Sequence, residues 1–129
     1  MVSKTPRPEK SLKVGDHTLT MTYGMFGEVM RLIGSAEDTV DILLRDPQVR
    51  DLIVRRLFTD LQRPIEDFNE LINPFEIDID PLEQDAIVAW VAEHALHFTM
   101  STAQKAQKVV EKYQETLASL NPSKTGSEA

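Results

Sequence analysis

The chain has 129 residues, of which 41% are hydrophobic and 27% charged, and a formal net charge of −7. This is the size and composition of one globular domain that can bury a core without disulfides or bound metals. The absence of cysteine excludes a disulfide framework, a thiolate nucleophile and a cysteine zinc site. No apolar run approaches the roughly 18 residues that span a bilayer, and residues 1–10 lack the apolar stretch of a secretory signal. We therefore expect a cytoplasmic protein with no membrane contact.

The charge is unevenly distributed along the chain. Residues 14–99 carry 17 acidic and 6 basic residues, a net charge of −11, whereas residues 1–13 carry +3 and residues 100–129 carry +1. An acidic body repels phosphate backbones, which argues against nucleic acid as a partner. Proline, alternating charge and polar composition predict a flexible arm at 1–10 and a flexible tail at 121–129, around a single helical domain at 11–120.

Residues 11–23 have the pattern of a β-hairpin. Leu19, Met21 and Tyr23 alternate with threonines, and period two places these apolar side chains on one face. Gly15 stands at the first central position of a two-residue turn, where glycine is favoured. Since two strands alone are marginally stable, we expect the apolar face to pack against helices.

Three helices are predicted between residues 24 and 58. The first runs from about Gly24 to Ile33 on an apolar period of 3.6 residues and stops at Gly34. A weak capping box opens a short helix from Ser35 to Leu44. Asp46 followed by Pro47 starts the third, as an N-cap with proline at the first helical position. The predicted buried stripe of this third helix consists of Val49, Leu52, Ile53, Leu57 and Phe58.

The segment between residues 64 and 80 shows weaker signals. Pro64 interrupts the helical period, and the apolar residues from Ile65 to Ile72 predict another short helix, ended by Asn73-Pro74. Residues 75–80 alternate apolar and acidic side chains, which predicts a short extended segment.

A last long helical region opens at Asp80-Pro81, where Glu83 completes a capping box. Residues 87–98 are apolar over more than half of the helix circumference, so Trp90 is expected to be largely buried. Residues 99–102 then separate this stretch from a different pattern. Because a helix much longer than about 25 residues is unusual in a globular domain, we favour a break or kink here over one continuous helix.

The sequence contains no recognisable catalytic apparatus. A nucleophile elbow, a phosphate loop and a dinucleotide fingerprint are all missing. We attribute the glycines of Tyr23-Gly-Met-Phe-Gly27 to close packing of a helix on the hairpin. The arginines between residues 50 and 63 are interleaved with aspartates, which predicts ion pairs on a solvated face. We expect no enzymatic activity, no catalytic residue and no cofactor.

Two groups of side chains resemble metal ligands only superficially. Glu76, Asp78 and Asp80 are spaced like the first ligands of a calcium loop, but Pro81 occupies the position of the loop glycine. His94 and His97 share a helix face without the third and fourth ligands that a metal needs. We therefore predict no metal site.

The most informative pattern is a heptad seam after residue 102. Its six residues step alternately by three and four, a period of 3.5 typical of helix pairing: Ala103, Ala106, Val110, Tyr113, Leu117 and Leu120. The seam is either an ordinary core element of this domain or a surface for a partner or a second copy. The positions that flank it, Gln107, Val109, Gln114 and Thr116, carry no charge.

The order of these features resembles the tail assembly chaperones of long-tailed bacteriophages. The resemblance rests on the hairpin and glycine-punctuated helix of residues 17–34, the acidic connections that follow, and Ile87-Val-Ala-Trp-Val-Ala-Glu-His-Ala-Leu-His-Phe98 before a lysine-bearing helix. It covers roughly residues 11–115. Members of this family are non-enzymatic proteins of viral morphogenesis in the host cytoplasm, and they are not expected in the finished virion. They bind the tape measure protein and recruit tail tube subunits.

The resemblance implies a chaperone whose partners are the tape measure protein and the tail tube protein. It carries over no catalytic residue, and the helical region after Trp90, with the seam from Ala103 to Leu120, is the candidate protein-binding surface. The alternative is a small homo-oligomeric regulator that dimerises through this helix, with its basic arm touching nucleic acid.

Overall fold

The computed structural model describes residues 7–34 and 39–120. Within them the chain is mainly helical, with an N-terminal hairpin and a long C-terminal helix, as predicted. The elements are β1 (Ser11–Val14), β2 (His17–Thr20), α1 (Tyr23–Ile33), α2 (Thr39–Arg45), α3 (Pro47–Phe58), the 3-10 turns η1 (Phe68–Glu70) and η2 (Pro74–Glu76), and α4 (Pro81–Leu120). The predictions for residues 1–6, for the capping box at Ser35 and for the tail at 121–129 lie outside the described residues.

The predicted hairpin is confirmed, with one correction. Strands β1 and β2 are antiparallel, and Val14 pairs with His17 across a turn in which Gly15 has a φ of 59°. Leu19 and Met21 are buried as expected. Tyr23, however, is 98% exposed, so its assignment to the same apolar face is wrong. The hydroxyl of Thr22 accepts the N–H of Met25 at 3.1 Å and caps α1, which turns Tyr23 out of the strand alternation.

The predicted end of the first helix at Gly34 and the predicted start of the third at Asp46 are confirmed. Gly34 ends α1 with a φ of 94°, and its N–H donates to the carbonyl of Met30 at 2.9 Å. Asp46 caps α3 by accepting the N–H groups of Gln48 and Val49. In the predicted stripe of α3, Ile53 and Leu57 are buried and the other three residues are half-buried.

The packing role predicted for the glycines of α1 is wrong. A Cβ atom added at Gly24 or Gly27 would meet no atom within 4 Å. The helix therefore does not need glycine at these positions for close approach to the hairpin.

The segment between α3 and α4 forms no α-helix, so the helix predicted over 65–72 is wrong. It is replaced by η1, where Asp67 and Glu70 form a capping box, and by a second 3-10 turn, η2, in place of the extended start predicted at residue 75. Side chains of α3 and of the residue that follows it bind the backbone of Ile72. Its carbonyl accepts from Arg55 and its N–H donates to the hydroxyl of Thr59, both at 2.9 Å. The bond to Thr59 uses the N–H of Ile72, which a helix over 65–72 would need for its own ladder.

Helix α4 is continuous over 40 residues, so the favoured break at residues 99–102 is wrong. Its predicted start is confirmed, because Asp80 accepts the N–H of Glu83 at 2.9 Å while the Glu83 carboxylate accepts the N–H of Asp80 at 3.0 Å. Residues 99–102 contain neither proline nor glycine, and serine and threonine weaken a helix by only a few tenths of a kcal/mol each. None of the helices in the described ranges combines the length and apolarity that membrane crossing requires.

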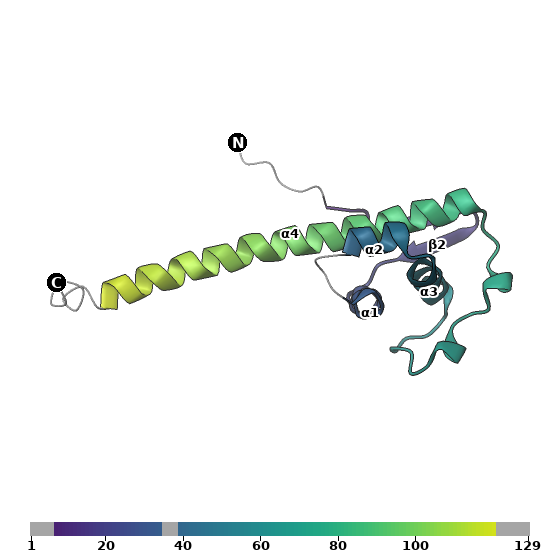
Figure 1. The fold of residues 1–129 in the computed structure, drawn as a ribbon, viewed down its shortest axis with the longest axis horizontal. Helices are drawn as coiled ribbons and strands as arrows, with labels where there is room; N and C mark the ends of the chain where they lie inside the picture. The colour runs from purple at the N-terminus through teal and green to yellow at the C-terminus, as the bar shows by residue number, and fades with distance from the viewer. Residues whose placement is uncertain (1–6, 35–38, 121–129) are drawn as a thin grey trace.

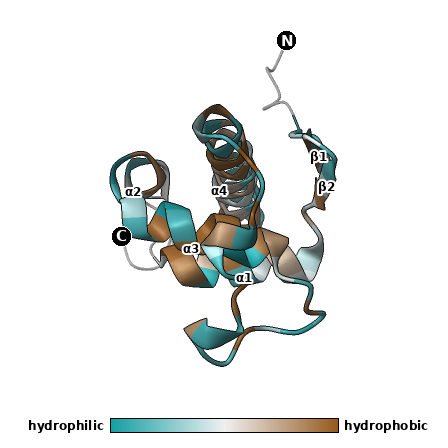
Figure 2. Ribbon diagram, turned by 90° about the vertical axis from the view of Figure 1, so that its right-hand side faces the viewer, coloured by the Kyte–Doolittle hydropathy of each residue, from teal (hydrophilic) through white to brown (hydrophobic). Residues whose placement is uncertain are grey.

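The other elements are gathered around one end of α4 (Figure 1). Helix α4 contacts α2, α3 and β1. Seen from the end of α4, α2 and the hairpin lie on opposite sides of it, and α1 and α3 lie below (Figure 2). The core fills this space, and Leu43, Ile53 and Ile87 are fully buried there. We call this packed unit, with residues 81–101 of α4, the body.

Candidate partner-binding surface

The second part of α4 extends beyond the body (Figure 1). Ser101 is the last partly covered residue, and every residue from 102 to 120 is exposed. We call residues 102–120 the free half of α4 and residues 81–101 its buried half. No other described element packs against the free half to cover it.

All six residues of the predicted seam lie on the free half and are exposed. Tyr113 and Leu120 show 68% and 70% of their surface, and Val110 and Leu117 about half. The possibility that the seam belongs to the core of this domain therefore fails for the described residues. The sequence pattern and the structure bring these six side chains together on one uncovered apolar surface.

The seam continues part of the face of α4 that the body covers. Eighteen residues make five turns of an α-helix, so residues that far apart have the same angular position, roughly 27 Å along the axis. The buried residues Val88, Val91, Ala92 and Ala95 thus correspond to Ala106, Val109, Val110 and Tyr113 on the free half. The seam and the covered face therefore overlap in part, because the buried Ile87 and Trp90 correspond to Lys105 and Lys108, which lie outside the seam.

The charged residues of the free half lie away from the seam. In the heptad that the seam defines, Lys105, Lys108, Glu111, Lys112 and Glu115 all take the outer positions. The seam and its flanks are therefore apolar or uncharged across a broad strip. Such a strip is suited to burial against another apolar helix.

An open hollow of about 1030 Å³ lies where the free half leaves the body, on the side of α4 that carries Lys105 and Lys108 and not on the seam. Phe26 and Phe98 line it, with ring centroids 5.2 Å apart, and Arg7, Lys105 and Lys108 supply positive charge. Residues before β1 are fixed beside it, because the carbonyl of Glu9 accepts from the indole of Trp90 at 2.7 Å and lies 2.9 Å from Nε2 of His94. The hollow is therefore a second surface, separate from the seam, lined by aromatic and basic side chains.

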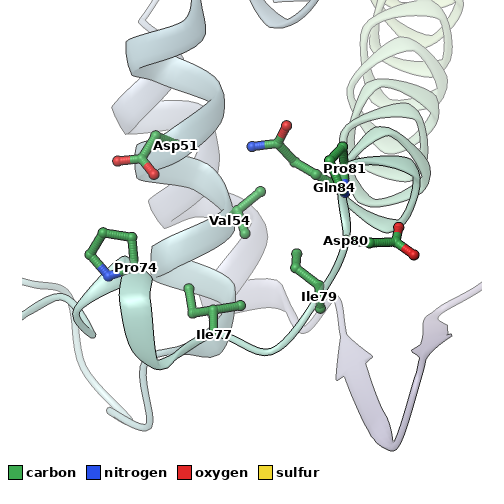
Figure 3. Close-up of a pocket in the computed structure, with 8 residues that line it drawn as sticks. All are labelled: Asp51, Val54, Pro74, Ile77, Ile79, Asp80, Pro81 and Gln84. Carbon is green, nitrogen blue, oxygen red and sulfur yellow. The ribbon is translucent and has the colours of Figure 1, made fainter.

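A smaller hollow of about 260 Å³ lies between α3, η2 and the start of α4 (Figure 3). Val54, Ile77 and Ile79 form its apolar part, and Asp51 and Asp80 are its acidic groups. Both carboxylates are engaged elsewhere, since Asp51 pairs with Arg55 at 3.5 Å and Asp80 caps α4. Their geometry supports the fold and brings no nucleophile or histidine into the hollow.

A buried ion pair inside the body was missed by the sequence interpretation. Glu28 is 5% exposed and Arg56 is 3% exposed, and Nε of Arg56 donates to the Glu28 carboxylate at 3.2 Å. The prediction that all four arginines lie on a solvated face is therefore wrong for Arg56. Of the others, Arg55 pairs with Asp51 as expected, whereas Arg50 pairs with Asp85 and Arg63 with Glu70.

This ion pair fixes the loop after α3. Glu28 also accepts the N–H of Ile65 at 2.7 Å and the guanidinium of Arg31 at 2.6 Å, while Arg56 donates to the carbonyls of Thr59 and Arg63. Burial alone would raise the pKa of the Glu28 carboxyl, but the bonds from Ile65, Arg31 and Arg56 outweigh it and hold the pKa below its usual value. The pair is an anchor within the body.

Helical spacing contained the signal for this pair. Glu28 follows Met25 by three residues and precedes Leu32 by four, so it lies on the apolar face of α1. Arg56 similarly follows Ile53 by three residues. A single acid and a single arginine on the apolar faces of two neighbouring helices predict a buried pair.

The described residues contain no cluster of histidine and carboxylate side chains suited to a metal ion. Comparisons of the chain with known protein families, with curated protein sequences and with solved structures find no match.

Proposed function

We propose that this chain is a non-enzymatic tail assembly chaperone of a long-tailed bacteriophage. In this role it binds the tape measure protein in the host cytoplasm through the seam on the free half of α4, and it helps recruit tail tube subunits. The observation that carries the proposal is the uncovered seam, together with the resemblance of residues 11–115 to this family.

The energetics of the free half support a binding role. An isolated helix of this length is marginal in water, so the free half gains stability when its apolar side is covered. Contiguous exposed apolar surface marks interaction sites in soluble proteins. A tape measure protein is a long helical chain whose apolar seams are exposed before the tail tube encloses them, and a matching helix can cover them.

The composition of the body suits such a role. The negative charge of residues 14–99 keeps a complex with an apolar client soluble. The seam has no charged flank that would restrict it to one register, which suits a client with repeated apolar segments.

Aspartate substitution of the seam tests the proposal. Val110, Tyr113 and Leu117 lie at its centre and are exposed in the single chain, so replacing all three with aspartate should leave the body folded. A tape measure protein of a long-tailed bacteriophage would be co-expressed with the wild type and with the triple variant. We expect it to be soluble with the former and to precipitate with the latter.

A matched control variant replaces with aspartate three exposed apolar residues that lie outside the seam: Leu44, Phe75 and Leu82. It adds the same charge and should keep the client soluble. If the triple seam variant unfolds, as measured by circular dichroism and Trp90 fluorescence, the assignment of the seam as a binding surface is wrong. If even the wild type keeps no tape measure segment in solution, the chaperone proposal fails and a homo-oligomeric regulator becomes the better account.

A further inference from the structure

We infer that in the absence of a client the free half of α4 pairs with that of a second copy. The pairing is antiparallel, and its two-fold axis passes between Glu111 and Lys112. The inference concerns how the seam is covered before a client binds, and it does not depend on the identity of that client.

Side-chain volume is unevenly distributed along the seam. Its small residues, Ala103 and Ala106, lie at one end, and its large residues, Leu117 and Leu120, lie at the other. Antiparallel pairing about the proposed axis places each alanine opposite a leucine of the partner, and Val110 opposite the partner's Tyr113. Every layer then combines a smaller and a larger side chain, which is how facing positions fill space evenly. A parallel pair would instead stack alanine on alanine at one end.

The length of the exposed segment fits the same two-fold axis. Exposure begins at residue 102 and the helix ends at Leu120, so the midpoint of the free half is residue 111. This midpoint coincides with the axis that the side-chain volumes define. In this register the partner's Leu120 lies opposite Ala103, so the partner's helix ends where the body begins.

The position of the body excludes the parallel arrangement. The body covers part of the angular face of α4 that carries the seam, as the positions of Val88, Ala92 and Ala95 establish. In a parallel pair, the buried half of each α4 would have to occupy the space of the other body. Antiparallel pairing places the two bodies at opposite ends of the paired helices.

Charge is compatible with this two-fold arrangement. Lys108 lies level with the partner's Glu115, and Glu111 with the partner's Lys112, so no like charges are level with one another. These side chains are on the outer sides of the helices and act only at long range. The flanking positions nearest the seam are uncharged, so nothing opposes the contact. The same surface patch is used on both copies, as in other two-fold dimers.

The oligomeric state of the full chain tests this inference. Analytical ultracentrifugation over a dilution series should give twice the mass of one chain at high concentration. Val110→Asp with Tyr113→Asp should reduce it to the mass of one chain, while circular dichroism of the body is unchanged. Leu82→Asp, on the same helix but outside the seam, should leave the dimer intact. A wild type that stays at the mass of one chain at every concentration would overturn the inference.

Disulfide trapping tests the orientation, because the chain has no cysteine of its own. Chains carrying Ala106→Cys and chains carrying Leu117→Cys, mixed and oxidised, should form mostly mixed disulfides between the two variants. Predominant 106-to-106 and 117-to-117 disulfides would indicate parallel pairing and contradict the register.

Exchanging a small and a large residue of the seam tests the register of the pair a second time. Ala106→Leu alone should weaken the dimer, because it meets the partner's Leu117, and adding Leu117→Ala should restore it. In a parallel pair Ala106→Leu alone would strengthen association. A monomeric protein that still keeps the tape measure protein soluble would disprove the self-pairing and leave the proposed function standing. A dimer that keeps no client soluble would support the self-pairing and disprove the proposed function.

Discussion

The two halves of α4 present the same face of one helix in opposite environments. In the buried half, Val91 is 1% exposed, whereas Val109, five turns further along, is 63% exposed. The buried half is apolar over more than half of its circumference and is surrounded by α2, α3 and β1. On the free half the apolar side chains are largely confined to the seam, and its flanks are mostly uncharged polar residues. The width of an apolar face therefore indicates how many elements cover it, since a narrow seam needs only a single helix.

The largest effect expected within this comparison is that of Trp90→Ala in the buried half. Trp90 was predicted to be buried, and this is confirmed by its 4% exposure. Removing the indole empties a core site and also loses its hydrogen bond to Glu9. We expect a loss of about 3–5 kcal/mol in the free energy of unfolding, measured by urea denaturation. A loss below about 1 kcal/mol would mean that the indole contributes little to the core.

Breaking the buried ion pair should cost nearly as much. Glu28→Ala leaves Arg56 charged and unpaired inside the body, which should lower the free energy of unfolding by about 3 kcal/mol. Asp41→Ala is the matched control, because it removes the exposed pair with Arg45 and should change stability by less than about 1 kcal/mol. Equal effects of the two substitutions would show that the buried pair does not anchor the body.

The lowered pKa values of Glu28 and Glu70 predict how the stability of the fold depends on pH. The pKa of Glu28 lies below its ordinary value of 4.5, and bonds from Arg63 and from the N–H of Glu66 lower the pKa of Glu70 to about 2. A lowered pKa in the folded state stabilises the fold fully above the unfolded pKa, and this contribution is lost as the pH falls through the folded value. Unfolding midpoints should therefore fall as the pH drops below about 4.5. Glu28→Gln should flatten this dependence, whereas Asp41→Asn should not.

A third substitution compares the two halves directly. Val91→Ala should destabilise the body by about 2 kcal/mol, since it removes buried methyl groups. Val109→Ala has the same chemistry at the equivalent angular position of the free half. Measured in the Tyr113→Asp background, where the second copy is absent, it should stay within about 0.5 kcal/mol of its parent. A cost of about 2 kcal/mol for Val109→Ala would mean that the free half is covered within one chain.

Local chemistry made much of this fold predictable from sequence. Gly15, Gly34, Asp46 and Asp80 each satisfy or redirect backbone groups of their immediate neighbours, so their elements were placed correctly. The seam was also identified by spacing alone. Its exposure was not predictable, because whether a face is covered depends on where the remaining chain packs and not on the pattern of that face.

The errors arose where distant groups compete with local signals. Residues 65–72 have a helical period, but Arg55 and Thr59 take the backbone groups of Ile72 from another part of the chain. Arg56 was placed on the surface because charged residues are usually exposed, and its partner Glu28 is remote in sequence. The break at residues 99–102 was favoured because long helices are unusual in globular domains, but no proline or glycine there interrupts the helix.

Gly27→Ala is expected to have the smallest effect, and it tests whether the stability of the body is independent of self-association through the free half. Gly27 lies inside α1, is exposed, and has open space around the position of a Cβ atom. Because glycine is less favourable than alanine inside a helix, Gly27→Ala should raise the free energy of unfolding of the body by about 0.5–1 kcal/mol. Self-association and client solubility should be unchanged, since Gly27 belongs to α1 in the body and not to the free half of α4. The variant would be compared with wild type by urea denaturation and by sedimentation. A change in dimer mass without a change in unfolding would contradict the separation of the two halves, because it would place α1 within the contact between copies.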